Sequence, residues 1–227
     1  MILKENETLE DLLIKDYKII QSKNLYRFSS DAVLLSKFAS AKRGDIVADL
    51  CAGSGIVGMH FFALHEDEIT SVSEFEIQPE LADICRRSAE YNGLADKIAT
   101  YNIRVQDIPK TMNGKFSLVL CNPPYKKLGS GETNPNKSEA LARHEIALTL
   151  DEAVQTAKRI LTHGGRFCIC QRTERFTDVF AAFRESGIEP SKLQFVKTAN
   201  GKEPYLFLLE GVKGVKRKFS ILPEIIN

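Results

Sequence analysis

The chain has 227 residues, of which 43% are hydrophobic and 27% are charged, and its 31 basic and 30 acidic residues give a net charge of +1. These values are typical of a globular protein and exclude a disordered, collagen-like or coiled-coil chain. They also exclude a polycation, so any nucleic-acid binding must come from local patches. No apolar run reaches the roughly 18–20 residues that cross a bilayer, and the N-terminus is too charged for a signal peptide. We therefore expect a cytoplasmic protein without a membrane association.

The first 44 residues are expected to form a cap that packs on a main domain of residues 45–227, so that the chain is one compact unit. A helical pattern of apolar residues runs over about 9–14. A second amphipathic pattern begins at Ser30 and places Val33, Leu34 and Phe38 on one face. Both patterns predict helices that precede the first strand of the main domain.

From residue 45, short apolar runs alternate with helical patterns. The runs at residues 46–50, 69–75, 98–103 and 116–121 predict strands. A helix is predicted over about 56–65, and a second one begins at Pro79 and ends at Asn92-Gly93. Strands that are separated by helices indicate a parallel sheet.

The second half of the chain continues this alternation. A capping box of Thr149 and Glu152 opens a predicted helix that ends at Gly164-Gly165. A strand at 166–170 and a helix at 176–185 follow, and strands at 193–198 and 205–210 flank the hairpin signal Asn200-Gly201. The predicted fold is therefore α/β: a Rossmann-like, doubly wound sheet of seven strands, mostly parallel, with an antiparallel last strand.

A glycine-rich turn follows the first strand of the main domain. Gly53, Gly55 and Gly58 match the dinucleotide-binding spacing, and Glu76 follows about 20 residues later. However, the carboxylate of Asp49 beside this turn would repel a pyrophosphate. It suits a ligand with a positive ammonium group, and S-adenosylmethionine has one, with a ribose whose hydroxyls Glu76 can accept. A tight turn without a ligand is the alternative interpretation.

The loop after the third strand offers one more candidate ligand. Asp107 stands where a carboxylate would reach the amino group of the cofactor's adenine. It also precedes Pro109, and a plain turn residue explains it equally well.

The most specific motif is the tetrapeptide Asn122-Pro123-Pro124-Tyr125, which directly follows a strand. The amino group of a purine or an amide is a poor nucleophile because its lone pair is delocalised. Two acceptors aimed at its N–H bonds, the Asn122 side-chain oxygen and the Pro123 carbonyl, would favour a pyramidal nitrogen. Tyr125 offers a face on which a base can stack, a contact worth about 1–3 kcal/mol. A simple turn with two prolines is the alternative interpretation.

These motifs together resemble the class I S-adenosylmethionine-dependent N6-adenine methyltransferases, and more narrowly the bacterial tRNA1(Val) adenine-37 N6-methyltransferase family. The resemblance covers nearly the whole chain. One departure is Cys51, at a position where glycine is commonest in the class I turn. The segments that carry the resemblance are 28–39, 49–58, 76–80, 122–125, 143–145 and 164–167.

The resemblance implies a role for each matching residue. The catalytic residues would be Asn122, Pro123, Pro124 and Tyr125. The cofactor would contact Phe28, Asp31, Asp49, Cys51, Gly53, Gly55, Glu76, Ile77, Asp107, Ile108 and Asn122. Local positive charge adds to this, and we expect substrate RNA, with tRNA as the implied partner, to contact Tyr125, Lys126, Lys127, Arg143, Lys216 and Arg217.

Two of these substrate assignments have alternatives. The segment Arg143-His144-Glu145 is equally explained as a solvated helix face, and the basic cluster Lys213, Lys216, Arg217 and Lys218 as a solvated tail. None of the four histidines has a metal-ligand spacing, the five cysteines are expected to be buried thiols, and methyl transfer requires no metal. The sequence predicts no oligomeric state.

Five other functions are alternatives. A protein-glutamine N5-methyltransferase uses the same tetrapeptide but resembles a chain with a longer N-terminal domain. An rRNA guanine-N2 methyltransferase also fits the motif, whereas DNA adenine methylation would call for a larger target-recognition region. A nicotinamide-dependent oxidoreductase or a non-catalytic RNA-binding module would explain the glycines but leaves Asn122-Pro123-Pro124-Tyr125 without a role.

Overall fold

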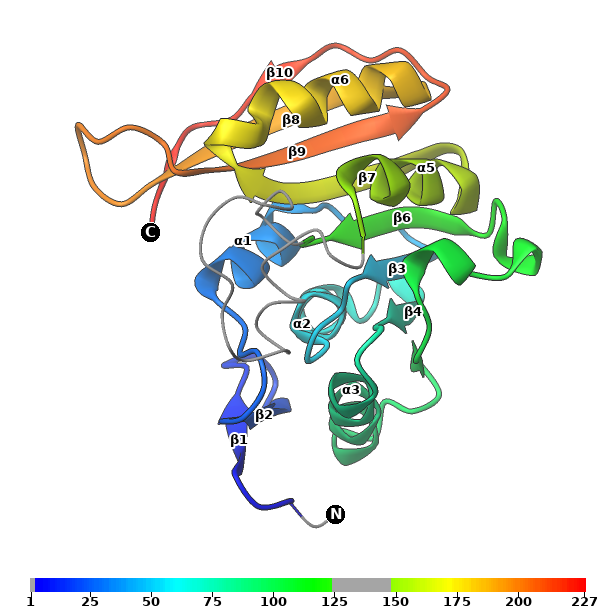
Figure 1. Ribbon diagram of the computed structural model, residues 1–227, viewed down its shortest axis with the longest axis vertical. Coiled ribbons are helices and arrows are strands. Elements are labelled where there is room, and N and C mark those ends of the chain that lie inside the picture. Colours follow the sequence, from blue (N-terminus) through cyan, green and yellow to red (C-terminus); the bar gives the residue numbers. More distant parts are fainter. Residues whose placement is uncertain (1–2, 124–147) are drawn as a thin grey trace.

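A single mixed sheet forms the centre of the computed structural model, which describes residues 3–123 and 148–227 (Figure 1). Seven strands run in the order β8-β9-β7-β6-β3-β4-β5, and β9 is the one that is antiparallel to its neighbours. This confirms the predicted fold class and its antiparallel last strand. The strands are β3 (Asp45–Leu50), β4 (Ile69–Phe75), β5 (Ile98–Tyr101), β6 (Phe116–Cys121), β7 (Leu161–Arg172), β8 (Ile188–Lys197) and β9 (Leu206–Lys213).

Two short strands extend the sheet beyond the prediction. β10 (Ser220–Ile221) and β11 (Ile225–Ile226) both pair in parallel with β8, which brings the sheet to nine strands in the described part of the chain. Each has only two residues, too few for an alternating apolar pattern to reveal it.

Helices cover both faces of the sheet, because alternate residues of the central strands point to opposite sides. Val47, Leu118 and Cys168 pack on one face, in the core cluster that contains the residues of α1 and α2. Ala48, Val119 and Phe167 pack on the other face, against α5 and α6. The helices are α1 (Ser30–Phe38), α2 (Ile56–His65), α3 (Pro79–Tyr91), α5 (Leu150–Ile160) and α6 (Phe176–Ser186). None of the described helices is long and apolar enough to span a membrane.

The N-terminal segment differs from its prediction. The expected helix over about 9–14 is wrong: β1 (Glu7–Asp11) and β2 (Lys18–Ser22) form an antiparallel hairpin. The chain reverses between them through left-handed residues, including Leu13, which has φ +57° and is 88% exposed. Burial of Ile20 against Leu81 and Ile84 of α3 explains why the segment forms a strand instead.

The second predicted N-terminal element, the helix from Ser30, is confirmed as α1. It lies against α2, where the Ser36 hydroxyl and His60 Nδ1 are 2.7 Å apart. Burial lowers the pKa of His60 to about 4, so this imidazole is neutral near pH 7. The contact joins the segment before the sheet to the helix that follows the glycine-rich turn.

Several element boundaries shift, and the strand predicted at 193–198 already begins at Ile188, as β8. The helix that begins at the Thr149–Glu152 capping box ends at Ile160, and not at Gly164-Gly165. The chain instead enters β7 at Leu161, and the pairing with β6 jumps from Phe116–Leu161 to Leu118–Arg166, so the glycines lie inside an irregular stretch of strand. The strand predicted to run to residue 103 ends at Tyr101.

Candidate functional site

A cleft opens at the carboxyl edge of the parallel strands, where β3, β4 and β6 end. It encloses about 880 Å³, counted with its opening to solvent. The order β6-β3-β4 places the three strand ends side by side. The described residues that line it are Tyr26, Phe28, Ala32, Cys51, Ala52, Gly53, Ser54, Ile56, Val57, Phe75, Glu76, Ile77, Gln78, Leu81, Arg104, Val105, Gln106, Asn122, Pro123 and Leu148.

The turn between β3 and α2 has the conformation that its glycines predict. Gly53 and Gly55 have φ of +59° and +85°, and Gly55 is the N-cap of α2. These angles are in the left-handed region, which costs a residue with a side chain about 1–2 kcal/mol. Cys51 also adopts it, at φ +61°, which explains why glycine suits that position.

Glu76 joins this turn to the end of β4. Its Oε2 accepts a hydrogen bond from the Gly53 N–H at 2.8 Å, and its Oε1 accepts one from the Gln78 N–H at 2.8 Å. Burial raises the pKa of Glu76 to about 7, although these two N–H donors act in the opposite direction. Glu76 lines the cleft, so its carboxylate is placed to accept hydrogen bonds from a ligand as well.

Asp49 lies elsewhere than the sequence indicated. Its side chain is fully buried, it does not line the cleft, and its Oδ2 accepts a hydrogen bond from the Gly58 N–H of α2 at 2.8 Å. The structure therefore places it beneath the turn, where it supports the start of α2. The sequence analysis paired Asp49 with the ammonium group of the ligand. In the structure the turn would separate Asp49 from a ligand in the cleft, so the two charges could interact only across the turn.

A second buried carboxyl group, Glu74, lies beside Asp49 and was not anticipated. The two residues are direct neighbours in the pairing of β3 with β4. Glu74 Oε2 accepts a hydrogen bond from the Thr100 hydroxyl at 3.0 Å. Asp49 Oδ1 and Glu74 Oε1 are buried and have no hydrogen-bond partner. The sequence could not predict this pair, because one acidic residue in an apolar strand does not show which residue of the neighbouring strand lies beside it.

Burial, and after it the charge of Asp49, raise the pKa of Glu74 to about 8. The pKa of Asp49 is raised to about 7, again chiefly by burial. Two neighbouring carboxyl groups without a cation are most stable when they are not both ionised. At least one of them therefore holds a proton near neutral pH.

Asn122 and Pro123 lie at the end of β6 and line the cleft with Glu76 and Gly53, as the tetrapeptide predicted. Pro124, Tyr125, Lys126, Lys127 and Arg143-His144-Glu145 lie outside the described residues.

Phe28, Cys51 and Ile77 also line the cleft. Besides Asp49, four other predicted cofactor contacts do not: Asp31, Gly55, Asp107 and Ile108. Asp31 is buried in the first turn of α1, with its carboxylate 3.9 Å from the Arg172 guanidinium. Asp107 is exposed and Ile108 is buried in the core, whereas Gln106 of the same 3-10 turn lines the cleft.

The sequence did not identify Tyr26, Gln78, Arg104 or Gln106 as lining residues. Tyr26 is two residues before Phe28, and the other three follow predicted strand ends. Their positions in the sequence could therefore have placed them near the cleft, although their residue types did not indicate it.

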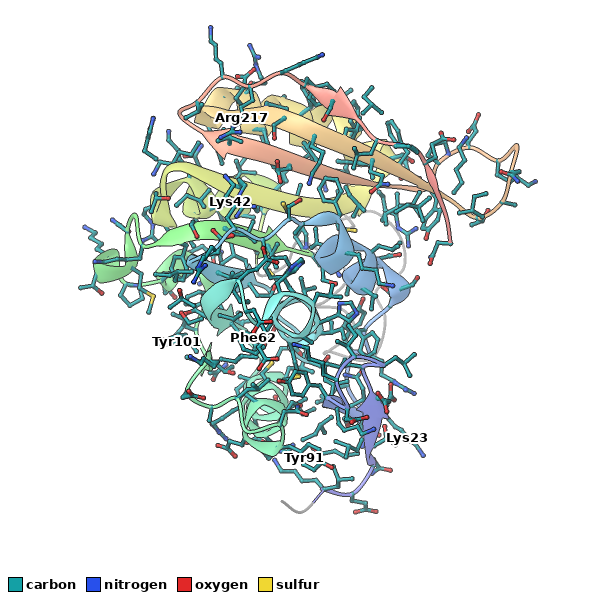
Figure 2. The ribbon with its side chains drawn as sticks, turned by 180° about the vertical axis from the view of Figure 1, so that it is seen from behind. Lys23, Lys42, Phe62, Tyr91, Tyr101 and Arg217 are labelled. Carbon is teal, nitrogen blue, oxygen red and sulfur yellow. The ribbon has the colours of Figure 1, made fainter. Side chains whose placement is uncertain are left out.

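Lys216 and Arg217 are far from this edge. They follow β9, whose last residues pair with the beginning of β7, as the register of Val212 with Arg166 shows. Because β9 is antiparallel, its carboxyl end lies at the amino edge of the parallel strands, opposite the cleft. Figure 2 shows Arg217 on the loop after β9 and Lys23 toward the other end of the molecule.

Comparison with known proteins agrees with this geometry. The family model described as the methyltransferase small domain matches residues 28–184. The chain belongs to this family. The match confirms the family resemblance that the motifs indicated.

Several curated relatives have the same name, tRNA1(Val) (adenine(37)-N6)-methyltransferase. The one from Porphyromonas gingivalis is 26% identical over 203 residues, covering 86% of this chain and 78% of its own. The one from Shewanella amazonensis is 29% identical over 189 residues, covering 82% and 78%.

Solved methyltransferases share the fold. A predicted O-methyltransferase from Agrobacterium tumefaciens has a TM-score of 0.66 at 22% identity and covers 86% of each chain. A geranyl diphosphate methyltransferase solved with S-adenosylmethionine has a TM-score of 0.57 at 13% identity, covering 81% of this chain and 84% of its own.

Replacing Gly55 by alanine should disrupt the turn. The added Cβ would meet Glu74 Oε1 at 2.8 Å and Cys85 Sγ at 3.2 Å, at a φ that already disfavours a side chain. We expect a loss of stability greater than the ~1–2 kcal/mol of the left-handed conformation alone and at least a tenfold loss of S-adenosylmethionine affinity, measured by calorimetry. Gly93→Ala is the control, because Gly93 has φ +69° but no atom within 4 Å of the added Cβ. Equal effects of both variants would contradict the crowding at Glu74.

The buried carboxyl pair predicts a pH dependence of stability. The folded pKa of Glu74, about 8, lies above its unfolded value of about 4.3. The folded state thus binds the proton more tightly, and this stabilisation is present at acid pH and lost as the pH rises from about 5 to 8. Glu74→Gln removes this titration and supplies an N–H donor toward Asp49. We expect the Tm of Glu74→Gln to rise relative to wild type as the pH increases from about 5 to 8, and the difference to stay level above that.

The measurement is Tm against pH by calorimetry, with exposed Glu203→Gln as the control that leaves the profile unchanged. A difference between wild type and Glu74→Gln that stayed constant from pH 5 to pH 9 would show that Glu74 does not titrate in this range.

Proposed function

We propose that this protein transfers a methyl group from S-adenosylmethionine to the exocyclic N6 of an adenine in RNA, with tRNA as the substrate. The observation that carries the proposal is the meeting of two motifs at one edge. Asn122 and Pro123 line the same cleft as Gly53 and Glu76. The relatives that bear the name of a tRNA1(Val) adenine-37 N6-methyltransferase support both the reaction and the RNA class.

The cleft fits the cofactor. Gly53 and Gly55 leave the backbone of the turn without side chains at left-handed positions, so a ligand can approach it closely. The carboxylate of Glu76 matches ribose hydroxyls, and the apolar side chains of Val57, Ile77 and Leu81 match an adenine ring. The positive end of α2 begins at the same turn and favours a carboxylate.

The residues of this chain contribute position and polarisation. S-Adenosylmethionine, when bound, supplies a methyl group on a sulfonium, which is already a strong electrophile. The Asn122 side-chain oxygen and the Pro123 carbonyl each accept a hydrogen bond from the adenine amino group. This frees the lone pair of the nitrogen for in-line attack on the methyl carbon. The nitrogen then loses one proton to solvent. Phe28 and Tyr26 line the cleft from the N-terminal segment, which acts as its cap and limits access of water.

Replacing Asn122 by alanine should abolish this polarisation while preserving the cofactor contacts. We expect at least a hundredfold loss of turnover, the size of effect seen when one catalytic hydrogen-bonding group is removed, and a change in S-adenosylmethionine affinity of less than threefold. The assay is incubation of unmodified tRNA with the enzyme and cofactor, followed by mass spectrometry of the nucleosides for N6-methyladenosine.

Asn200→Ala, in the exposed hairpin turn between β8 and β9, is the matched control. Wild type that methylates neither tRNA nor rRNA adenine would contradict the proposed reaction, and full turnover by Asn122→Ala would contradict the role of that residue.

A further inference from the structure

Three chain segments at the amino edge of the sheet carry a dense group of cations. We call residues 110–115, 158–163 and 213–218 the basic edge. These 18 residues contain eight of the chain's 31 lysines and arginines, where an even distribution would give two or three, and no aspartate or glutamate. The cations are Lys110, Lys115, Lys158, Arg159, Lys213, Lys216, Arg217 and Lys218.

The three segments form one continuous surface. The Arg159 guanidinium donates a hydrogen bond to Asn113 Oδ1 at 2.6 Å, which joins the first segment to the second. Lys213 Nζ donates one to the Leu161 carbonyl at 2.6 Å, which joins the third. An open groove lies between them, lined by Lys158, Arg159, Lys213 and two polar residues of α5.

The charge of this surface is not neutralised within the described parts of the chain. Among the described residues, 3–123 and 148–227, no ion pair involves any of the eight cations. Six of the eight are exposed. Burial lowers the pKa of Lys213, and the charge of Lys158 lowers it further. By contrast, Arg87 beside the N-terminal hairpin contacts both Glu7 and Asp83. Like charges held together without counter-ions repel each other, and a polyanion removes that repulsion.

The basic edge lies opposite the cleft. Lys115 precedes β6 and Asn122 follows it, and six residues of strand span about 20 Å. Figure 1 shows the arrows of β6 and β9 pointing in opposite directions, so that the end of β9 lies away from the end of β6. A ligand in the cleft cannot touch the basic edge, but a folded RNA is large enough to reach both.

We propose that the basic edge binds the phosphate backbone of the substrate RNA at a distance from the methylated base. The inference rests on the proposed function, because it assigns the anion to the molecule whose adenine enters the cleft. Phosphates recur along an RNA, and three cationic segments on one surface match several of them at once. The same surface would therefore favour a whole tRNA over a short fragment of it.

The test uses one exposed cation from each segment, in the triple variant Lys115→Gln, Lys158→Gln, Lys218→Gln. The control is Lys37→Gln, Lys97→Gln, Lys202→Gln, which removes the same charge from exposed positions elsewhere. Filter binding of whole tRNA at several salt concentrations gives the affinity and its salt dependence. Each phosphate contact contributes about 0.7–0.9 to the slope of log K against log salt.

We expect the basic-edge variant to bind tRNA at least tenfold more weakly near 0.15 M salt and to lower that slope by about 2. The control should change affinity less than twofold. Calorimetry should give the same S-adenosylmethionine affinity for all three proteins, and a stem-loop too short to reach the amino edge should bind equally to them.

Binding is measured without methylation, so the two proposals can fail separately. Equal tRNA affinity of wild type and the basic-edge variant overturns the inference, and so does equal weakening in both triple variants. If wild type binds tRNA through the basic edge but forms no N6-methyladenosine, the inference stands and the proposed reaction fails.

Discussion

The site depends on one junction, the hydrogen bond from the Gly53 N–H to the carboxylate of Glu76. The parallel register of β3 with β4, in which Leu50 pairs with Phe75, ends both strands at the same level. The chain leaving β3 must then turn sharply into α2, and it can do so because Gly53 and Gly55 adopt left-handed angles. Glu76 joins this turn to the next strand. A cleft with a defined wall exists because these two strand ends are bonded to each other.

The junction lies above buried acid. Asp49 accepts the Gly58 N–H from beneath, and the space that a side chain at Gly55 would need is occupied by Glu74. Burying carboxyl groups without a cation is costly unless they are protonated or hydrogen-bonded. Here the Gly58 N–H donates a hydrogen bond to Asp49 and the Thr100 hydroxyl donates one to Glu74. The raised pKa values of both groups also favour their protonated forms. A cationic sulfonium ligand at this turn would offset the negative charge of these groups when they ionise, which is a physical reason for the arrangement.

Most of the fold could be predicted because its signals are local. Apolar runs, the Thr149–Glu152 capping box and the glycine turn each specify their own segment, and seven strands follow from them. The N-terminal hairpin could not be predicted in this way, because Ile20 is held in a strand by Leu81 and Ile84 of a distant helix. The same distinction holds in the site. Asn122 and Glu76 directly follow strand ends and line the cleft, whereas a single turn of 3-10 helix decides that Gln106 and not Asp107 reaches it.

The position of Lys216 and Arg217 shows that two tasks, holding the reacting base and binding the RNA backbone, need not be performed at the same place. A basic cluster in a methyltransferase suggests contact with substrate near the reacting base, but the antiparallel direction of β9 carries this cluster to the far edge of the sheet. Chemistry at the carboxyl edge requires groups aimed at one nitrogen, and these come from strand ends. Affinity for a polyanion requires only charge density, which loops at the amino edge supply without disturbing the cleft. If both proposals hold, a sheet with one antiparallel strand places the reacting base and the RNA backbone on opposite edges, and this separation itself would select for a large RNA.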